Sequence, residues 1–276
     1  MIVVKSLGPG VLLIGLNRPE KRNALTRPTI EQLTQRVRES GLDDTVRGVV
    51  LAGEGPSFCA GVDLEEFASG NVDSGRALIG ALKELCATLR GLPKPVACAI
   101  QGHCLGGALE VAACCDFRVC APEARLGMPE VGLGIPSVID AVMLVRQVGA
   151  ARAWELLLTG EPIDGQTAYA WGLANRLAPP ERVIEVAAEL VGQVMRHDPA
   201  VVAAQKRLHR AWLELPYTEA VERSLEPLLD AFRAGRPQRL AAERLRARAA
   251  QRLQARPQPR QDGGGSDEYS RSRKRR

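Results

Sequence analysis

The sequence lacks the short motifs that mark several common enzyme classes. It contains no Gly-x-Ser-x-Gly nucleophile turn. The glycines at positions 102, 106 and 107 form neither a dinucleotide-binding Gly-x-Gly-x-x-Gly motif nor a phosphate loop, because no Gly-Lys-Ser/Thr follows them. The three histidines, His103, His197 and His209, have no metal-ligand spacing. We therefore expect no serine-nucleophile, nucleotide-binding or zinc chemistry, and no metal site.

The sequence also lacks paired cysteines and long apolar runs. The seven cysteines are an odd number, contain no Cys-x-x-Cys pair and lie mostly among apolar neighbours. This usage is typical of free, buried thiols in a reducing compartment. No apolar run reaches the ~18 residues of a membrane span, and the N-terminus runs straight into a strand-like pattern without a leader. We expect a cytoplasmic protein that does not associate with membranes.

The positive charge of the chain is concentrated at one end. The formal net charge is +5, but residues 236–276 hold 13 Lys/Arg against 4 Asp/Glu, a charge of +9, which leaves −4 for residues 1–235. The basic tail therefore says nothing about the ligand of the body. Such a tail binds nucleic acid or membrane phosphate in some proteins, although a solvated tail is the more common case. Its Pro/Gly/Ser/Arg-rich end beyond Pro257 is predicted to be disordered.

The periodicity predicts an α/β protein with strands first and helices last. Two β-rich runs separated by Gly8-Pro9-Gly10 indicate a hairpin, and later short apolar runs indicate buried strands. A strand followed by a glycine turn and a helix occurs twice, which predicts stacked β-β-α turns. The expected strands are 2–4, 11–16, 46–53, 96–100 and 117–119, and the expected helices are 29–39, 74–90, 107–115, 137–148, 150–159, 164–171, 182–196, 199–213, 218–234 and 238–254. In 74–90 the apolar residues expected to face inward are Ile79, Leu82, Leu85, Cys86 and Leu89.

Two glutamates occupy surroundings that are unusual for a carboxylate. Glu110 follows a glycine turn and lies among small apolar residues, and Glu130 lies in an apolar loop rich in glycine and proline. A buried carboxylate must be paired, or its pKa rises until it holds a proton near neutrality. Proton-transfer enzymes use acids in such surroundings. The alternative is that each glutamate is a structural acid in a salt bridge.

Four stretches, in order, resemble the crotonase, or enoyl-CoA hydratase/isomerase, family across roughly residues 1–235. They are Leu16-Asn17-Arg18-Pro19 with Asn23-Ala24-Leu25; Phe58-Cys59-Ala60-Gly61-Val62-Asp63-Leu64; Gly102, Gly106-Gly107 and Glu110 with Asp116; and Pro129-Glu130 with Leu133-Gly134-Ile135-Pro136. The resemblance implies a β-β-α superhelix core at 1–195 and a helical C-terminal trimerisation region at 196–235. The Arg-rich helix and basic tail at 236–276 lie outside it. It also implies a homotrimer or a dimer of trimers.

The resemblance also implies roles for particular residues. The backbone N–H groups of Val62 and Gly107 form an oxyanion hole for a thioester carbonyl; both follow small-residue turns, and Gly107 opens a helix whose positive end favours a developing enolate. Glu110 orients and deprotonates water, while Glu130 gives a proton to the α-carbon. The implied contacts to substrate and coenzyme A are Arg22, Ala24, Ala60, Asp63, Leu64 and Gly106. Coenzyme A is part of the substrate, so no separate cofactor is expected.

The sequence departs from the family pattern after Pro136. Many hydratases of the family carry a glycine-rich turn here, whereas this chain continues Ser137-Val138-Ile139-Asp140 and is expected to begin a helix. We expect this change to reshape the acyl pocket, with Pro136 and Asp140 at it.

The resulting hypothesis is an enoyl-CoA hydratase, a lyase that adds water reversibly in syn geometry to a 2-trans-enoyl-CoA, as in fatty-acid β-oxidation. One alternative is a Δ3,Δ2-enoyl-CoA isomerase, or another acyl-CoA enzyme of the family, that uses a single acid. A second is a non-catalytic scaffold of the same fold that binds nucleic acid through its basic tail.

Overall fold

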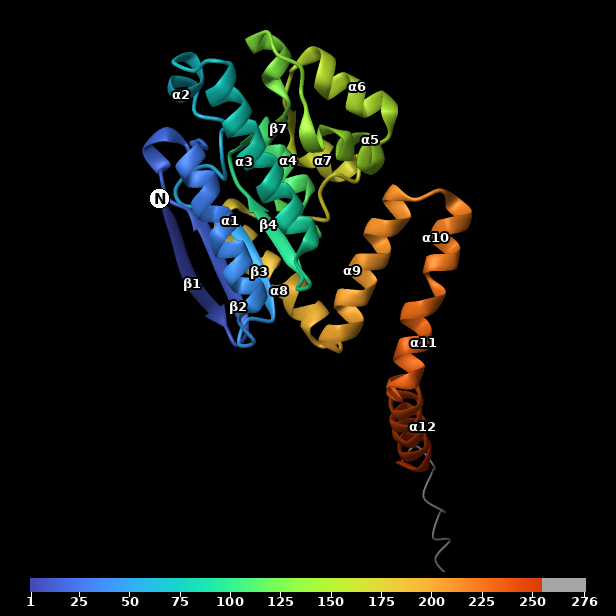
Figure 1. Ribbon diagram of the computed structural model, residues 1–276. Helices are drawn as coiled ribbons and strands as arrows, with labels where there is room; N and C mark the ends of the chain where they lie inside the picture. Colours follow the sequence, from blue (N-terminus) through green and yellow to red (C-terminus); the bar gives the residue numbers. More distant parts are fainter. Residues whose placement is uncertain (255–276) are drawn as a thin grey trace, which may run out of the picture. The chain divides into compact units, whose positions relative to one another are not determined.

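The computed structural model describes residues 1–254, and its main sheet has six strands (Figure 1). Their order across the sheet is β1-β2-β3-β4-β6-β9. The bounds are β1 (Ile2–Gly8), β2 (Val11–Leu16), β3 (Gly48–Gly53), β4 (Val96–Ile100), β6 (Phe117–Cys120) and β9 (Arg176–Leu177). The first two strands form the expected antiparallel hairpin, and all later neighbours pair in parallel. Every residue of β3 and β4 is buried, which explains their continuous apolar sequences.

A second sheet lies beside the first and carries part of the site. It consists of β5 (His103–Leu105), β7 (Arg125–Gly127) and β8 (Ile163–Asp164), in that order. The chain passes from β4 to β5 through Gly102, whose φ is +56° and where a Cβ would lie 2.1 Å from the carbonyl oxygen of Pro56. This close approach admits only glycine. The strand, the turn and the helix after β5 make the expected β-β-α arrangement.

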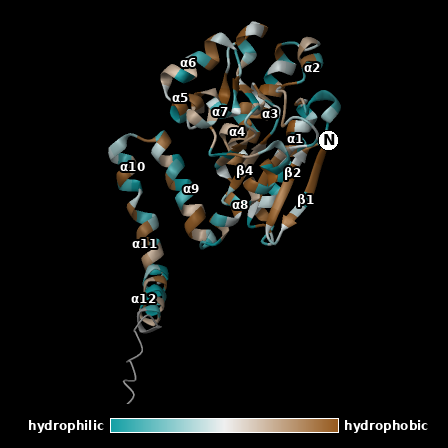
Figure 2. Ribbon diagram, turned by 180° about the vertical axis from the view of Figure 1, so that it is seen from behind, coloured by the Kyte–Doolittle hydropathy of each residue, from teal (hydrophilic) through white to brown (hydrophobic). Residues whose placement is uncertain are grey.

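The helices that pack on the main sheet have clear start signals. In α1 (Arg27–Leu42) the Thr26 hydroxyl accepts a hydrogen bond from Thr29 N–H, and Asn71 and Ser74 form a capping box at α3 (Val72–Gly91). These two helices pack against each other, while α8 (Val183–Met195) packs on β3, β4 and β6. In α3 the buried residue of the second turn is Leu78 and not the expected Ile79, which is half-buried. In Figure 2 the hydrophobic residues around β4 lie among the helices, whereas β1 lies at the edge of the sheet.

The other helices include expected ones and several short ones that the sequence did not predict. They are η1 (Pro19–Lys21), α2 (Leu64–Ala68), α4 (Gly107–Ala113), η2 (Pro129–Leu133), η3 (Ile139–Ala141), α5 (Val142–Val148), α6 (Ala150–Thr159), α7 (Gly165–Ala170), η4 (Pro180–Arg182), α9 (Pro199–Glu214), α10 (Tyr217–Arg223), α11 (Leu225–Arg233) and α12 (Arg236–Gln254).

Two of the expected helices were wrong in part. The segment 137–148 does not begin as a helix, because Val138 is extended and Ile139 has a φ of +53°. The expected helix 218–234 is divided at Ser224. Pro227 has no N–H to donate to the carbonyl of Arg223, so the hydrogen-bond series of one continuous helix cannot form there.

The chain divides into two compact units, Met1–Arg223 and a second that begins at Ser224. In the second unit, α11 carries exposed Leu225, Leu228 and Phe232. The domain boundaries expected after residues 195 and 235 stay predictions, and the expected disordered end beyond Pro257 lies outside the described residues. No helix within residues 1–254 combines the length and the apolarity required to cross a bilayer. All seven cysteines are buried and free, as the sequence predicted.

Candidate active site

Glu110 is a buried acid on the short helix α4. Its residue is 4% exposed, and its Oε1 accepts a hydrogen bond of 3.0 Å from the backbone N–H of Ala141. Burial raises the pKa of Glu110 to about 8, and the nearby charges of Glu130 and Asp140 add to the rise, while the Ala141 hydrogen bond opposes it. Glu110 therefore changes its protonation state within the physiological pH range.

Glu130 is half-buried in the first turn of η2 and faces the same place. Its Oε2 accepts a hydrogen bond of 3.1 Å from the Ser137 hydroxyl, and burial raises its pKa. Its carboxylate lies directly against Gly106, where a Cβ would lie 2.5 Å from Oε1 and where φ is +54°. Glu110 is also close to Gly106, since its backbone N–H donates to the Gly106 carbonyl at 3.2 Å, so both acids lie beside the same glycine.

The two predicted backbone donors, Val62 and Gly107, lie next to each other. A Cβ built on Gly107 would lie 3.8 Å from Val62 Cγ1. Gly107 is the first residue of α4, so its N–H has no acceptor within the helix, and among residues 1–254 neither it nor the Val62 N–H donates a backbone or side-chain hydrogen bond. The turn before Val62 requires glycine, since Gly61 has a φ of +96° and a Cβ there would lie 2.7 Å from the Leu105 oxygen. Two such N–H groups, one of them at the first residue of α4, are suited to stabilise an oxyanion.

The segments around residues 18–25 and 59–64 run side by side near these donors. The Ala60 N–H donates to the Arg22 carbonyl at 2.9 Å, and an isolated bridge pairs Leu25 with Val62. Arg22 is exposed and has a φ of +49°, and Ala24 is half-buried.

Asp63 and Leu64 have different surroundings. The Asp63 carboxylate caps α2 by accepting hydrogen bonds from the N–H groups of Glu65 and Glu66, and it pairs with Arg18 at 3.2 Å. Arg18 and the cap hydrogen bonds hold the pKa of Asp63 below its usual range although burial opposes them. Leu64 is 57% exposed. Asp63 thus fixes the loop that carries Val62, which is a structural contribution that the sequence did not indicate.

Of the two residues expected at the acyl pocket, Pro136 is exposed and Asp140 is 6% exposed. Asp140 forms an ion pair with Arg90 of α3, and its second oxygen, Oδ2, is buried without a hydrogen-bond partner in the described part of the chain. The sequence did not single out Arg90, because a cation in the last turn of a helix is ordinary.

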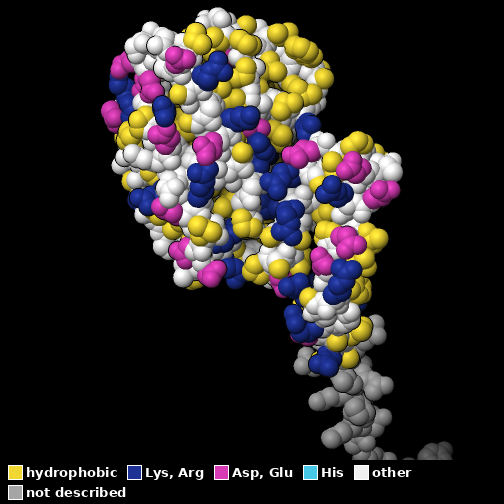
Figure 3. Space-filling model, in the orientation of Figure 1, with side chains coloured by type: hydrophobic (Ala, Val, Ile, Leu, Met, Phe, Trp, Pro, Cys, Tyr) yellow, Lys and Arg dark blue, Asp and Glu magenta, His cyan; other side chains and the backbone are white. Residues whose placement is uncertain are grey.

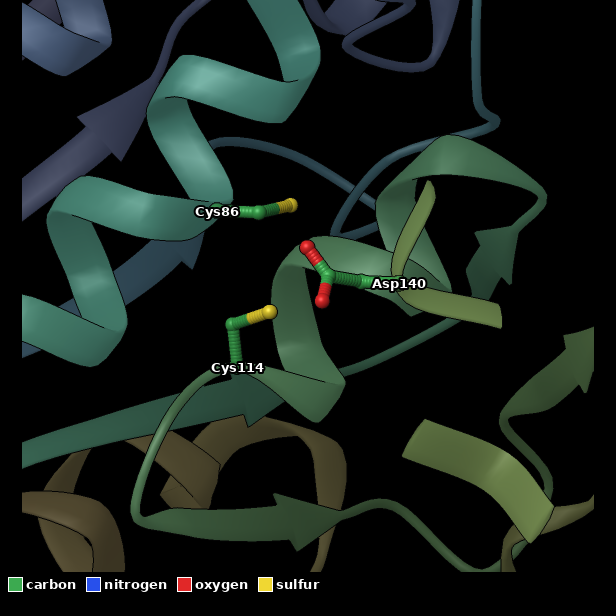
Figure 4. Close-up of side chains that lie close together, drawn as sticks. All are labelled: Cys86, Cys114 and Asp140. Atoms are coloured by element: carbon green, nitrogen blue, oxygen red, sulfur yellow. The ribbon is translucent and has the colours of Figure 1, made fainter. Parts of the chain in front are cut away.

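Cys86, Cys114 and Asp140 form a cluster whose potential ligand atoms lie within 4.8 Å of one another (Figure 4). Arg90 contacts two members of this cluster. It forms an ion pair with Asp140, and its Nη1 donates to Cys114 Sγ at 3.4 Å. Hydrogen bonding with Cys114 and burial raise the pKa of Cys86 well above its usual value, so this thiol stays protonated. A guanidinium already neutralises the aspartate, and the cluster does not fit a cation.

Arg90, Cys114 and Asp140 also line a groove. It is lined by residues of α4, α5 and α9 and includes a set of cations, namely Arg90, Arg118, Arg146, Lys206 and Arg210. Figure 3 shows Lys and Arg side chains gathered beside α9. Within the groove, Lys206 pairs with Asp116 at 2.6 Å.

Comparison with known proteins identifies the family. A profile of the enoyl-CoA hydratase/isomerase family matches residues 7–234. The 2,3-dehydroadipyl-CoA hydratase of Escherichia coli K12 is 35% identical over 224 residues, which cover 80% of this chain and 87% of that protein. A probable enoyl-CoA hydratase of Bacillus subtilis is 39% identical over 203 residues, covering 72% of this chain and 76% of that protein. The crystal structure of an enoyl-CoA hydratase from Polaromonas sp. JS666 matches with a TM-score of 0.84 at 26% identity, covering 88% of this chain and 96% of that chain.

The matched region contains the main sheet from β2 onward, the glycine turns, Glu110, Glu130 and the N–H groups of Val62 and Gly107. Together with the fold, the match shows that this chain belongs to the enoyl-CoA hydratase/isomerase family and has its crotonase-type fold.

Proposed function

We propose that the protein is an enoyl-CoA hydratase that adds water reversibly to the double bond of a 2-trans-enoyl-CoA. The observation that carries the proposal is the pair of acids, Glu110 and Glu130, both with raised pKa values, beside the two free N–H groups of Val62 and Gly107. Relatives named as hydratases support the same chemistry, among them a short-chain-enoyl-CoA hydratase of Clostridium acetobutylicum, 34% identical over 199 residues.

The N–H groups of Val62 and Gly107 would bind the thioester oxygen. When a hydroxide equivalent adds to the β-carbon, the negative charge moves to this oxygen as an enolate. Preorganised N–H donors stabilise that charge, and loss of one such donor typically costs about 10²–10³ in rate. The donors also draw electrons from the double bond, which makes the β-carbon electrophilic.

One of the two acids would accept a proton while the other donates one. In hydration, ionised Glu110 takes a proton from water as its oxygen attacks the β-carbon, and protonated Glu130 delivers a proton to the α-carbon. In dehydration each group acts in reverse. Burial raises the pKa of both Glu110 and Glu130, which favours a site that keeps one proton near neutral pH. The pair titrates as a unit, so the singly protonated form serves both directions.

The other predicted contacts belong to the same proposal. The residues that would contact the substrate and its coenzyme A part are Arg22, Ala24, Ala60, Asp63, Leu64 and Gly106, and no separate cofactor or metal is needed. The protein would act in the cytoplasm as a homotrimer or a dimer of trimers in fatty-acid β-oxidation.

The test is hydration of crotonyl-CoA, followed by loss of the absorbance of the conjugated thioester. Glu110→Gln and Glu130→Gln should each lower kcat by at least about 10², whereas Glu123→Gln, an exposed matched control, should not change it. Full activity in either active-site variant contradicts the proposal. Faster turnover of a 3-enoyl-CoA than of crotonyl-CoA would instead make the protein an isomerase.

A further inference from the structure

We propose that Arg90 and Asp140 are a positioning pair that holds the backbone N–H of Ala141 against the catalytic carboxylate of Glu110. The inference rests on the proposed function, because it assigns the pair to the same proton-transfer site. Neither residue belongs to the glycine turns or to the pair of acids, and Arg90 lies on α3, a different helix from Glu110.

A continuous set of contacts connects Arg90 to Glu110. The guanidinium of Arg90 forms an ion pair with Oδ1 of Asp140, which is almost completely buried. The next residue, Ala141, is 5% exposed and donates its N–H to Glu110 Oε1 at 3.0 Å. This N–H also donates to the Val138 carbonyl at 3.1 Å, so the position of Asp140 and the turn from Val138 together orient it. A donor fixed in this way orients one oxygen of Glu110 and leaves the other for water.

The backbone at this point requires an anchor. Ile139 has a φ of +53°, a left-handed conformation that β-branched residues rarely adopt. Such a conformation persists only where surrounding contacts over-determine it, and these residues concentrate at functional sites. The contacts around it include the Arg90–Asp140 ion pair on one side and the Ala141–Glu110 hydrogen bond on the other, and the Ala141 N–H is shared with the Val138 carbonyl at 3.1 Å. The ion pair helps to hold the left-handed conformation of Ile139, and that conformation lets Ala141 reach Glu110.

The pair also controls the charge beside Glu110. The ionisable groups around Glu110 are Glu130 of η2, Asp140 of η3, and Cys86 and Arg90 of α3. Two carboxylates and the burial of the site oppose ionisation of Glu110, and Arg90 is the cation that compensates Asp140. Removal of Arg90 leaves the negative charge of Asp140 uncompensated, which raises the pKa of Glu110. Removal of the Asp140 charge leaves the positive charge of Arg90 uncompensated, which lowers the pKa of Glu110.

The experiment compares Arg90→Met with Asp140→Asn in the full-length protein. The first readout is the pH titration of the Glu110 side-chain carboxyl carbon by NMR, assigned by its loss in Glu110→Gln. The pKa of Glu110 should rise in Arg90→Met and fall in Asp140→Asn, by about one unit each. Because this readout needs no substrate, it tests the pair even if crotonyl-CoA is not hydrated, a result that would defeat the proposed function alone.

The second readout is steady-state hydration of crotonyl-CoA. Each variant should lower kcat by about tenfold or more, with KM changed less than about threefold, because the pair orients Glu110 and does not touch the thioester. Arg90→Lys keeps the charge and should recover part of kcat. It also takes the place of Arg90→Met in the experiment if that variant fails to fold. Arg146→Met is the matched control, since Arg146 is exposed in the same groove, and should match the wild type. Shifts in the same direction, or an unchanged kcat, overturn the proposal.

Discussion

Replacement of Glu110 by Gln is expected to stabilise the folded protein at alkaline pH while it abolishes activity. Burial raises the pKa of Glu110 from its ordinary value of 4.5 to about 8. Below pH 4.5 the acid is protonated in both the folded and the unfolded state, and it does not disfavour folding. As the pH rises, the unfolded state ionises first and is thereby favoured, so the free energy of unfolding falls until the pH passes about 8.

The size of the effect follows from the shift. A difference of about 3.5 pKa units, at about 1.36 kcal/mol per unit, amounts to about 5 kcal/mol at pH 9. Glutamine has nearly the same volume, and its side-chain oxygen still accepts the Ala141 N–H, so the replacement mainly removes the ionisation. We expect Glu110→Gln to raise the free energy of unfolding by about 3–5 kcal/mol at pH 9 and by less than about 1 kcal/mol at pH 5. Typical domains are stable by only about 5–15 kcal/mol, so the difference is large.

The assay is urea unfolding followed by circular dichroism at pH 5 and pH 9, at one protein concentration. Glu123→Gln serves as the control, because this residue is exposed. Equal stabilisation at the two pH values would point to a packing effect and would refute the argument. No stabilisation at pH 9 would show that Glu110 ionises without cost, and the assignment of a buried, proton-holding acid would fail.

Three further results are expected. The rate of hydration should depend on pH as a bell-shaped curve whose alkaline limb lies near pH 8, where the pair loses its last proton; a rate that stays level to pH 10 would contradict this. Gly106→Ala should lower kcat by about tenfold or more, because its Cβ would displace Glu130 and its φ is +54°. Gly132→Ala, where a Cβ meets open space, is the control, and equal kcat values for the two variants would count against the contact between Gly106 and Glu130. Arg118→Met should lower the free energy of unfolding by about 3 kcal/mol, since this buried guanidinium donates to the carbonyls of Leu173, Ala112 and Cys115. Urea unfolding measures it, and a loss below about 1 kcal/mol would show that the carbonyls of Leu173 and Cys115 find other partners.

The parts of the fold that follow from local pattern could be predicted from the sequence. The hairpin and the strands β3 and β4 were confirmed because apolar runs between glycines and prolines leave few alternatives. The buried face of α3 was predicted with one residue in error, since Leu78 and Ile79 are both apolar neighbours and only the packing distinguishes them. The division at Ser224 was missed although Pro227 offered a signal.

The site shows the same limit. Glu110 and Glu130 were recognisable because an acid among small apolar residues is unusual, and the glycine turns beside them had to come close to other backbone. Arg90 was not recognisable, because its partner lies fifty positions away in sequence and it resembles any cation near a helix end. The left-handed Ile139 was missed for a related reason: β-branched residues rarely adopt a positive φ, and no neighbouring residue in the sequence marks the exception.

The proposed oxyanion donors are main-chain amides, and this has a practical consequence. Exchange of the side chain at Val62 leaves its N–H in place, so a survey of alanine variants would pass over the group that binds the developing charge. Only an amide-to-ester replacement at residue 62 or 107 would delete a donor by itself. Most single substitutions at Val62 therefore leave the donor intact. A substitution at Gly61 would disturb it, because the turn before Val62 has no room for a side chain.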